Sequence, residues 1–253
     1  MKVLVTGASS GIGRDIAREF AKRKYDLVLV ARNIERLEEL KEELKKEYHV
    51  DAQYLSVDLS KRENCIDLYN KVKDIDILVN NAGLGDYGDF AETELTKDLS
   101  IIDTNITSVH ILTKLYLKDM KEKNSGKILN VASIAGFMPG PLMATYYASK
   151  NYVVRLSEAI REELKKLKSD VKISILCPGP VKTNFNNVAN VKFQISSLSS
   201  EYVAKYAVEQ FLKDKFYIVP GLTIKVAKCL TKIVPTPLVS KVSYRMQKRK
   251  EGK

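Results

Sequence analysis

The sequence of 253 residues has no tryptophan, two histidines and three cysteines. Cys65, Cys177 and Cys229 are odd in number, far apart and outside any Cys-x-x-Cys pair. A disulfide framework or a zinc site needs more ligands, or ligands at closer spacing. We therefore expect neither disulfides nor a bound metal.

Long apolar runs are also missing from the sequence. No stretch approaches the roughly 20 apolar residues that a membrane-spanning helix needs. The apolar run within residues 1–7 is too short for a signal peptide, so we expect a cytoplasmic protein. The composition, 45% hydrophobic and 29% charged, is typical of a globular protein.

The net charge of +11 is unevenly distributed along the chain. Residues 222–253 contain nine lysines and arginines and a single acidic residue, Glu251, which gives this segment +8 and leaves +3 on the other 221 residues. A nucleic-acid-binding protein usually needs a basic face on its folded body. The distribution therefore argues against a nucleic-acid partner.

Seven short segments rich in β-branched residues recur along the chain, and helical spacing of apolar residues separates them. The strand-like segments are Lys2–Thr6, Leu27–Val30, Ala52–Val57, Ile75–Val79, Lys127–Val131, Lys172–Cys177 and Phe216–Val219, and the helix-like segments include Ile12–Lys22, Ile34–Glu47, Asp98–Lys121 and Thr145–Leu167. Most strand segments are continuously apolar, as in strands buried on both faces of a parallel sheet. Ser60 and Glu63 have the spacing of a capping box at a further helix start.

This alternation predicts an α/β fold, a doubly wound Rossmann fold with a seven-stranded parallel sheet and helices on both faces. No linker or repeat interrupts residues 1–220. We therefore expect one domain over residues 1–220, followed by a basic helical tail over residues 221–253.

Gly7, Gly11 and Gly13 form a G-x-x-x-G-x-G pattern between the first expected strand and the first expected helix. Gly7 can turn the chain sharply, and Gly11 lets the backbone approach a pyrophosphate. The N-terminus of the following helix would favour the phosphates through its free N–H groups and its dipole. The same glycines would also suit a tight strand-to-helix turn that binds nothing.

The end of the second strand distinguishes between nicotinamide cofactors. A site for NAD usually has an acidic residue about 20 residues past the glycines, where it binds the ribose 2′-hydroxyl. Here the strand is followed by Arg32, whose planar guanidinium suits a phosphate dianion. This predicts NADP(H), with Arg32 as the main contact and Ser9 or Ser10 assisting. Arg32 would otherwise be a solvated residue at a helix start.

Tyr146 and Lys150 are four residues apart, so on a helix they share one face. A phenol with a pKa near 10 is a poor acid or base at neutral pH, and a nearby ammonium lowers that pKa toward the useful range. Ser133, 13 residues before Tyr146, could bind a substrate oxygen as charge develops on it. The set predicts a carbonyl/alcohol oxidoreductase, although a Tyr-x-x-x-Lys pair alone is common on helix surfaces.

At this level the sequence resembles the short-chain dehydrogenase/reductase family over residues 1 to about 220. The motifs that carry the resemblance are Thr6-Gly7-x-x-x-Gly11-x-Gly13, Asn80-Asn81-Ala82-Gly83, Asn105, Ser133, Tyr146-x-x-x-Lys150 and Pro178-Gly179-Pro180-Val181-Lys182-Thr183, in the family's order. The resemblance implies hydride transfer between NADP(H) and a carbonyl compound or alcohol. Tyr146 would move the proton, Lys150 would bind the nicotinamide ribose, and Ser133 would bind the substrate oxygen.

The resemblance also implies roles for other residues. Asn105 would kink its helix and hold a water molecule of the proton relay, and Asp58 would contact the adenine. The full set of implied cofactor contacts is Gly7, Ser9, Ser10, Gly11, Ile12, Gly13, Arg32, Asp58, Leu59, Asn81, Ala82, Gly83, Tyr146, Lys150, Pro178, Gly179, Val181 and Thr183. Asp58 and Asn81 would equally suit a helix start and a turn. The family often forms homodimers or homotetramers through helices such as Asp98–Lys121 and Tyr146–Leu167.

Three segments should line the substrate space: Leu84–Phe90, Phe137–Met143 and Asn184–Leu198. The middle segment is apolar and contains two methionines, which adapt to irregular shapes. This predicts a hydrophobic carbonyl compound or secondary alcohol as substrate, unless these side chains only pack beneath their loops. A non-catalytic NADP-binding interaction or redox-sensing protein is the competing hypothesis. The intact set of four catalytic residues favours an enzyme.

The tail, Gly221–Lys253, extends beyond the family's minimal length and resembles two helical pieces broken at Pro235-Thr236-Pro237. Its apolar residues alternate with lysines and arginines. This pattern favours packing on the body or on a neighbouring subunit. It also suits a basic amphipathic helix on an anionic membrane surface, the minority interpretation.

Overall fold

The computed structural model describes residues 1–183, 185, 197–231 and 233–248. The strands are β1 (Lys2–Thr6), β2 (Asp26–Ala31), β3 (Ala52–Ser56), β4 (Ile77–Asn80), β5 (Lys127–Val131), β6 (Lys172–Leu176), β7 (Val181–Lys182), β8 (Leu198–Ser199) and β9 (Tyr217–Ile218). The helices are α1 (Gly11–Ala21), α2 (Ile34–Tyr48), α3 (Arg62–Lys71), α4 (Leu95–Ile102), α5 (Ser108–Glu122), α6 (Ala144–Lys166), α8 (Ser200–Leu212), α9 (Leu222–Leu230) and α10 (Thr236–Lys248). The described residues also form a π-helical turn, η1 (Asp103–Thr107), and a 3₁₀ turn, η2 (Ile134–Phe137).

The main sheet has seven parallel strands in the order β3-β2-β1-β4-β5-β6-β9, which confirms the predicted doubly wound fold. Val5 of β1 pairs with Leu29 of β2 on one side and with Val79 of β4 on the other. The strand order therefore reverses beside β1. In sheets of this kind, ligands bind at such a switch point, beyond the carboxyl ends of the strands.

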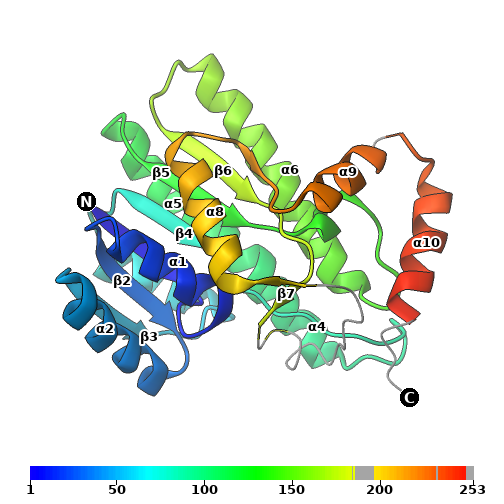
Figure 1. Cartoon of the computed structure of the whole chain (residues 1–253), viewed down its shortest axis with the longest axis horizontal. Coiled ribbons are helices and arrows are strands. Elements are labelled where there is room, and N and C mark those ends of the chain that lie inside the picture. The colour runs from blue at the N-terminus through cyan, green and yellow to red at the C-terminus, as the bar shows by residue number, and fades with distance from the viewer. Residues whose placement is uncertain (184, 186–196, 232, 249–253) are drawn as a thin grey trace.

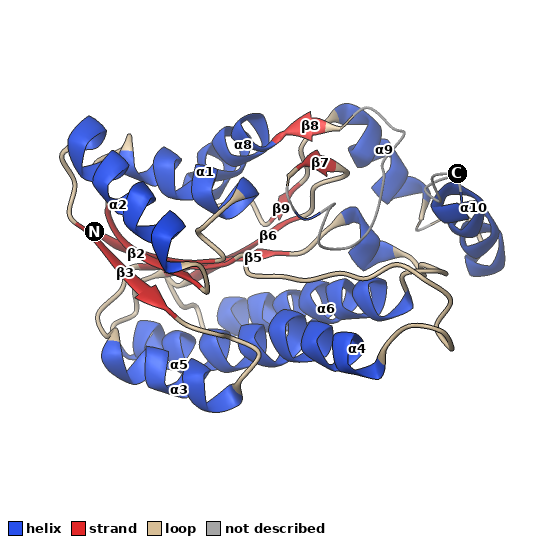
Figure 2. Ribbon diagram, turned by 90° about the horizontal axis from the view of Figure 1, so that it is seen from below, coloured by secondary structure: helices blue, strands red, loops and turns tan. Residues whose placement is uncertain are grey.

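Helices cover both faces of the sheet. Figure 2 shows α1, α2 and α8 on one face and α3, α4, α5 and α6 on the other. Each face has its own apolar core, with Phe20 against Phe211 in the first and the buried Tyr116 in the second. Among the described residues, no helix combines the length and the apolar character needed to cross a bilayer.

Three details differ from the sequence-based expectation. Ser60 does not cap α3, because its hydroxyl donates to Asp58 instead, at 2.8 Å. The expected helix Asp98–Lys121 is interrupted by the π turn η1, an irregularity that is frequent at functional sites. Helix α8 was not predicted, although its buried face packs closely on α1.

The tail forms two helices, α9 and α10, separated near Pro235 as predicted. In Figure 1 they lie to the right of the sheet, at the end of the molecule away from the N-terminus. Ile224 of α9 occupies the space beside Gly179, where a Cβ atom would lie 2.5 Å from its Cδ1 atom. The tail therefore packs on the body of the protein. This contact is with the loop that follows β6.

Candidate active site

A cavity of about 1040 Å³ lies beyond the carboxyl ends of the strands. Of the residues predicted for the site, those that line it are Gly7, Ser9, Ser10, Gly11, Ile12, Arg32, Asp58, Leu59, Asn81, Ala82, Gly83, Ser133, Tyr146, Lys150, Pro178, Gly179, Val181 and Thr183. Most of these residues come from the loops after β1, β2, β3, β4, β5 and β6, and the others from the start of α1, from β7 and from helix α6. The fold thus brings together residues that are up to 176 positions apart, from Gly7 to Thr183.

The glycine loop after β1 is fixed by hydrogen bonds to the loop after β4. The hydroxyl of Thr6 accepts from the backbone N–H groups of Asn81 and Ala82, at 2.9 and 3.1 Å. The side-chain amide of Asn81 donates to the carbonyl oxygens of Thr6 and Gly7. Gly7 has a φ of 65°, a conformation that glycine adopts at little cost. Asn81 therefore shapes the loop and also faces the cavity.

Gly13 and Asn105 do not line the cavity. Gly13 lies behind the loop, where a Cβ atom would overlap the amide of Asn81. Asn105 is fully buried at the π turn, where its amide donates to the carbonyl of Leu84 at 2.8 Å and to the hydroxyl of Ser149 at 3.0 Å. Its Oδ1 atom also accepts from the backbone of Leu84. Both residues therefore position their neighbours, and the water predicted at Asn105 stays a prediction.

Two arginines face the outer end of the cavity, after β2. Arg32 was predicted there, and Arg36 in the first turn of α2 joins it. Between them, Asn33 caps α2 by accepting from the backbone N–H of Arg36, at 2.8 Å. Asp58 lies nearby. Burial opposes its ionisation, but hydrogen bonds from Ser60 and the charge of Arg32 hold the pKa of Asp58 below its usual value.

Ser133 and Tyr146 both line the cavity wall, where the Ser133 hydroxyl donates to the carbonyl oxygen of Pro178 at 3.4 Å. Ser133 is the N-cap of η2, and its side chain accepts from the backbone N–H of Ala135 at 3.2 Å. The side chain of Asn151 connects η2 to α6, because its amide donates to the carbonyls of Ala135 and Met138 as well as to that of Tyr147. The two hydroxyls are thus held on rigid elements.

Lys150 lies on the same face of α6, one turn after Tyr146. Its Nζ atom donates to the carbonyl oxygen of Val131 at 3.0 Å and lies 5.8 Å from the centre of the Tyr146 ring. Gly83 and Lys150 lie close together, since a Cβ atom on Gly83 would be 3.4 Å from the ammonium nitrogen. Only 5% of Lys150 is exposed, so its charge is largely withdrawn from water.

The expected lowering of the phenol pKa is not found. Burial raises the pKa of Tyr146 to about 12, and the hydrogen bond with Ser133 opposes this only in part. Burial also lowers the pKa of Lys150 to about 8. The ring of Phe185, 5.4 Å from that of Tyr146, contributes to the apolar surroundings. Desolvation is therefore the largest influence on the phenol pKa, and the ammonium bonds a backbone carbonyl rather than the phenol oxygen.

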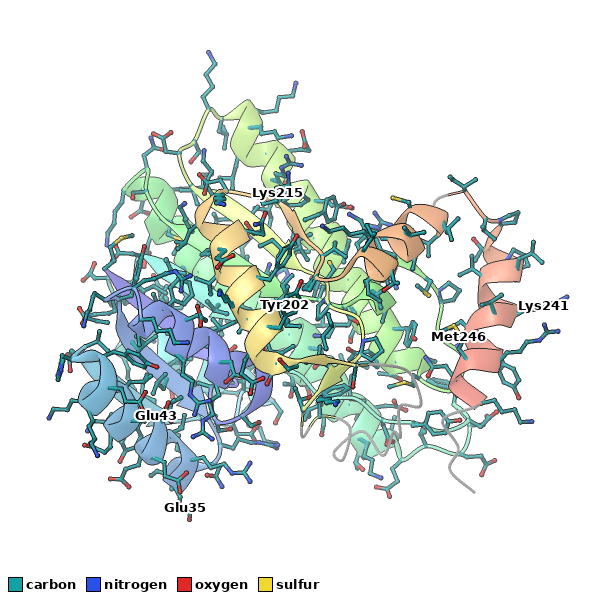
Figure 3. The ribbon with its side chains drawn as sticks, viewed as in Figure 1. Glu35, Glu43, Tyr202, Lys215, Lys241 and Met246 are labelled. Carbon is teal, nitrogen blue, oxygen red and sulfur yellow. The ribbon has the colours of Figure 1, made fainter. Side chains whose placement is uncertain are left out.

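Sequence reasoning missed part of the cavity wall, which comes from the tail. The tail residues that line the cavity are Thr223, Ile224, Ala227, Leu230, Thr231, Val234, Val239, Val242, Ser243, Met246 and Gln247. Figure 3 shows Met246 on the side of α10 toward the body and Lys241 extending outward. The i, i+3, i+4 spacing of Val239, Val242 and Ser243 indicates a helix with one face to bury. The spacing does not indicate which surface that face covers.

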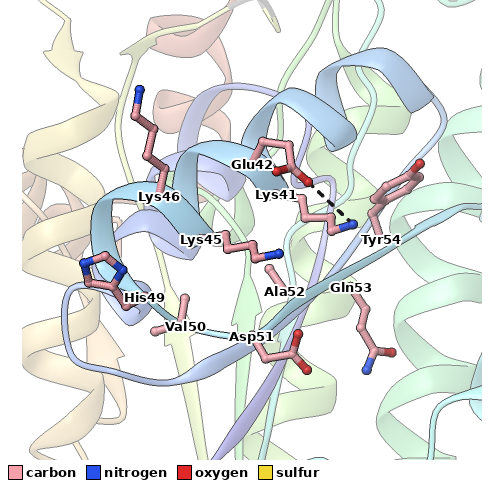
Figure 4. A pocket seen from close by; sticks show the side chains of 10 residues that line it. All are labelled: Lys41, Glu42, Lys45, Lys46, His49, Val50, Asp51, Ala52, Gln53 and Tyr54. Carbon is pink, nitrogen blue, oxygen red and sulfur yellow. Dashed lines mark ion pairs between the residues drawn. The ribbon is translucent and has the colours of Figure 1, made fainter.

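A second concave surface lies at the sheet edge, between α2 and β3. Figure 4 shows the ten residues that line it, among them Lys41, Lys45 and Tyr54, with an ion pair between Lys41 and Glu42. None of the residues predicted for the site lines this surface. The chemistry predicted from the sequence therefore belongs to the cavity at the carboxyl ends of the strands.

Known proteins resemble this chain in sequence. A model of the short chain dehydrogenase family matches residues 1–192. The very-long-chain 3-oxoacyl-CoA reductase of Anas platyrhynchos is 32% identical over 201 residues, which cover 75% of this chain and 62% of that protein. The estradiol 17-beta-dehydrogenase 11 of Mus musculus is 33% identical over 250 residues, which cover 96% of this chain and 83% of that protein. The chain spans 54 to 62% of the length of the first reductases that it matches.

Solved structures resemble it in fold. A short-chain dehydrogenase from Sphingobium yanoikuyae in complex with NADPH superposes with a TM-score of 0.83 at 27% sequence identity. The match covers 92% of this chain and 96% of that one. The structural similarity therefore covers more of the chain than the family model, which ends at residue 192.

Proposed function

The chain belongs to the short-chain dehydrogenase family, and from this premise we propose that it is an NADP(H)-dependent oxidoreductase acting on an apolar carbonyl compound or secondary alcohol. The observation that carries the proposal is the gathering of Ser133, Tyr146 and Lys150 in the wall of one cavity, with Tyr146 and Lys150 one turn apart on α6. A protein that only binds a nucleotide needs no such set.

The residues around the cavity fit a nicotinamide dinucleotide phosphate. Gly11 lets the glycine loop pack closely against Thr183. A Cβ atom at position 11 would lie 2.9 Å from the Thr183 methyl carbon. Arg32 and Arg36 supply two guanidinium groups where a 2′-phosphate would lie. The similar chain that was solved with NADPH also supports this choice of cofactor. When bound, the cofactor supplies or accepts the hydride.

The catalytic residues have distinct tasks in this proposal. The Ser133 hydroxyl donates to the substrate oxygen and strengthens that bond as negative charge develops. Tyr146 Oη gives its proton to the same oxygen during reduction and takes it back during oxidation. Lys150 binds the nicotinamide ribose, the role that the family resemblance implies for it, from its place in the cavity wall. Asn105 holds Leu84 and Ser149 and thereby the wall beside Lys150.

The cavity wall supports an apolar substrate. Met138, Met143 and the side chains contributed by α9 and α10 are mainly aliphatic. The names of the two relatives also support this, because one acts on very-long-chain 3-oxoacyl-CoA and the other is called an estradiol dehydrogenase. We propose that the substrate extends from Tyr146 along the inner faces of the tail helices.

Oxidation of NADPH in the presence of ketones, fused-ring ketones and 3-oxoacyl thioesters tests this function. We expect turnover of at least one apolar ketone and none of short polar ones. Because the chain has no tryptophan, the fluorescence of bound NADPH can be followed with little background. Binding of NADPH without turnover of any carbonyl compound would instead support the competing hypothesis, a non-catalytic redox-sensing protein.

The outer surfaces support two further proposals about partners. Leu95 and Leu99 of α4 are 70% and 49% exposed, and such apolar side chains beside α5 and α6 support a homodimer or homotetramer. The tail exposes further apolar residues, including Leu222 at 76% in α9 and Ile233 at 80% between α9 and α10. Lysines and arginines accompany them, so we propose peripheral attachment to an anionic membrane surface. The cytoplasmic location stays a prediction.

A further inference from the structure

Gln247 of α10 has a buried side chain with an unpaired polar atom. The residue is 1% exposed, and its Nε2 atom donates to the hydroxyl of Tyr147. Its Oε1 atom has no hydrogen-bond partner. Four buried side-chain atoms in the described part of the chain share this state, and the other three belong to Arg14, Asn80 and Ser174. Only Gln247 lines the active-site cavity.

The surroundings of Gln247 hold its amide in one place. The hydroxyl of Tyr87 donates to the backbone carbonyl of Gln247 at 3.2 Å. Burial raises the pKa of Tyr147, and the side chains of Ser243, one turn earlier in α10, and of Gln247 oppose this shift. Gly140 lies directly against the Tyr147 ring, where a Cβ atom would overlap it. The backbone of Gln247 and the ring that its amide contacts are therefore both held in place.

An unpaired carboxamide oxygen in this position favours a ligand with a donor group. Buried polar groups nearly always find a partner, and leaving one without a partner is unfavourable. The neighbouring wall is apolar and includes Val239, Val242 and Met246. Among the described residues that line the cavity, Asp58 is the single acidic one, and it follows β3 at the cofactor end. An uncharged hydroxyl fits such a site better than an ammonium group, which would lack a counter-charge.

The position of Gln247 relative to the reacting groups indicates which part of a substrate it would meet. The Tyr147 ring lies 6.0 Å from the Tyr146 ring. A substrate whose carbonyl oxygen is bound by Tyr146 and Ser133 would pass Tyr147 before it reaches the amide. The contact would therefore be made at the far end of the substrate.

We propose that Gln247 is a specificity-determining residue whose Oε1 atom accepts a hydrogen bond from a hydroxyl group remote from the reacting carbonyl. The proposal rests on the proposed function. It makes the preferred substrates hydroxy ketones, or the corresponding diols, with an apolar middle and two oxygens at a fixed separation.

Two series of ketones test the proposal: unbranched 2-alkanones of increasing length, and the same ketones with a hydroxyl on the terminal carbon. The readout is the ratio of kcat/KM for the hydroxylated ketone to that for the plain ketone of the same length. A fixed acceptor predicts a maximum at one chain length, about 10- to 100-fold above the neighbouring lengths. A ratio that changes steadily with length, without a maximum, would overturn the proposal.

Substitutions at position 247 test whether the Gln247 amide causes the maximum in the kcat/KM ratio. In Gln247→Leu the maximum should disappear. In Gln247→Asn it should move to a chain longer by one methylene, because the amide retracts by roughly one C–C bond of about 1.5 Å. Tyr244→Leu, on the same helix and outside the cavity lining, should leave the maximum in place. A maximum that survives in Gln247→Leu would exclude this residue as its cause.

Binding without turnover separates this proposal from the proposed function. Quenching of bound NADPH fluorescence by the two ketone series, in a Tyr146→Phe background, gives dissociation constants that need no chemistry. A length maximum in affinity supports the role of Gln247 even if no ketone is reduced by the unmodified protein. Turnover of plain ketones without any length maximum supports the proposed function and contradicts the role of Gln247.

Discussion

The ammonium nitrogen of Lys150 lies 3.0 Å from the carbonyl oxygen of Val131, at the end of β5, and 5.8 Å from the centre of the Tyr146 ring. The end of the strand therefore holds the cation beside the phenol without a direct bond to its oxygen. Both groups are buried. Burial raises the pKa of Tyr146 and lowers that of Lys150, so it disfavours the charged form of each. The protonation states of Tyr146 and Lys150 therefore depend on the charge of any ligand bound in the cavity.

The affinity for NADPH should fall as the pH rises above about 8. Burial lowers the pKa of Lys150 to about 8, so the unliganded protein loses this charge above that pH. An anionic cofactor raises the pKa of a nearby ammonium, so its binding takes up a proton. The dissociation constant should rise by up to about tenfold per pH unit. Fluorescence titration checks this, and the same pH dependence in Lys150→Met would contradict it.

Replacement of Tyr146 by phenylalanine should lower kcat by about 10²- to 10⁴-fold, the usual contribution of general acid–base catalysis. The ring remains, so the dissociation constant for NADPH should change by less than about threefold. Tyr152→Phe is the matched control on the same helix, because its hydroxyl pairs with His110 at an exposed position. Steady-state rates and fluorescence titrations distinguish the two variants. Undiminished turnover in Tyr146→Phe would refute the assignment of the acid.

Replacement of Arg32 or Arg36 by alanine should weaken NADPH binding by about 10- to 100-fold, because each guanidinium forms charge-assisted hydrogen bonds to a phosphate. NADH lacks the 2′-phosphate and should lose less than about threefold. Arg62→Ala, on the exposed start of α3, is the matched control. Dissociation constants for both cofactors give the result. Equal losses for NADPH and NADH would remove the argument for NADP(H).

The substitution Gly136→Ala should impair catalysis by moving α6. A Cβ atom at this position would lie 2.7 Å from the backbone oxygen of Lys150, which cannot rotate away. We expect kcat to fall more than about tenfold, because misplaced catalytic groups lose orientation. In Gly88→Ala the new atom would meet only the methyl group of Thr93, at 2.9 Å. Rates and melting temperatures that are equal in the two variants would contradict the role of this contact.

Reversal of charge on the outside of the tail should weaken membrane attachment. The double variant Lys241→Glu/Arg245→Glu should lose most of its co-sedimentation with anionic liposomes, because each basic residue near such a surface contributes about 1 kcal/mol. The double variant Lys165→Glu/Lys166→Glu, at the end of α6, is the control. Liposomes of neutral lipid should bind neither protein. Retained co-sedimentation of the tail variant would end the membrane proposal.

Much of this architecture could be predicted from the sequence because the signals were local. The continuous apolar runs gave the strands, and the boundaries of β1 and β5 match the predicted ranges. Glycine spacing, the absence of an acidic residue after β2, and the Tyr146–Lys150 pair placed the cofactor loop and the catalytic helix on one edge of the sheet. Parallel strands direct their carboxyl ends to the same edge, so the fold class alone implied this convergence.

The remaining features depended on packing between distant segments. The pKa of Tyr146 was predicted in the wrong direction, because residue spacing carries no information about desolvation. Arg36 was overlooked since its contribution depends on the turn that Asn33 caps. The inner wall formed by the tail could not be inferred, because an amphipathic helix with basic residues suits a membrane, a subunit or its own body equally well.

The packing of Ile224 against Gly179 has a consequence for how this enzyme could change over time. The residues up to about Thr183 carry the glycine loop and the proton-transfer groups of the cavity. The tail, a separate segment of the chain, forms another part of the cavity wall. A duplicated gene could thus acquire a new preference through mutations confined to its last two helices, while the inherited chemistry persisted. Libraries for directed evolution should concentrate on those helices, and exchange of the segment between paralogues should transfer selectivity as a unit.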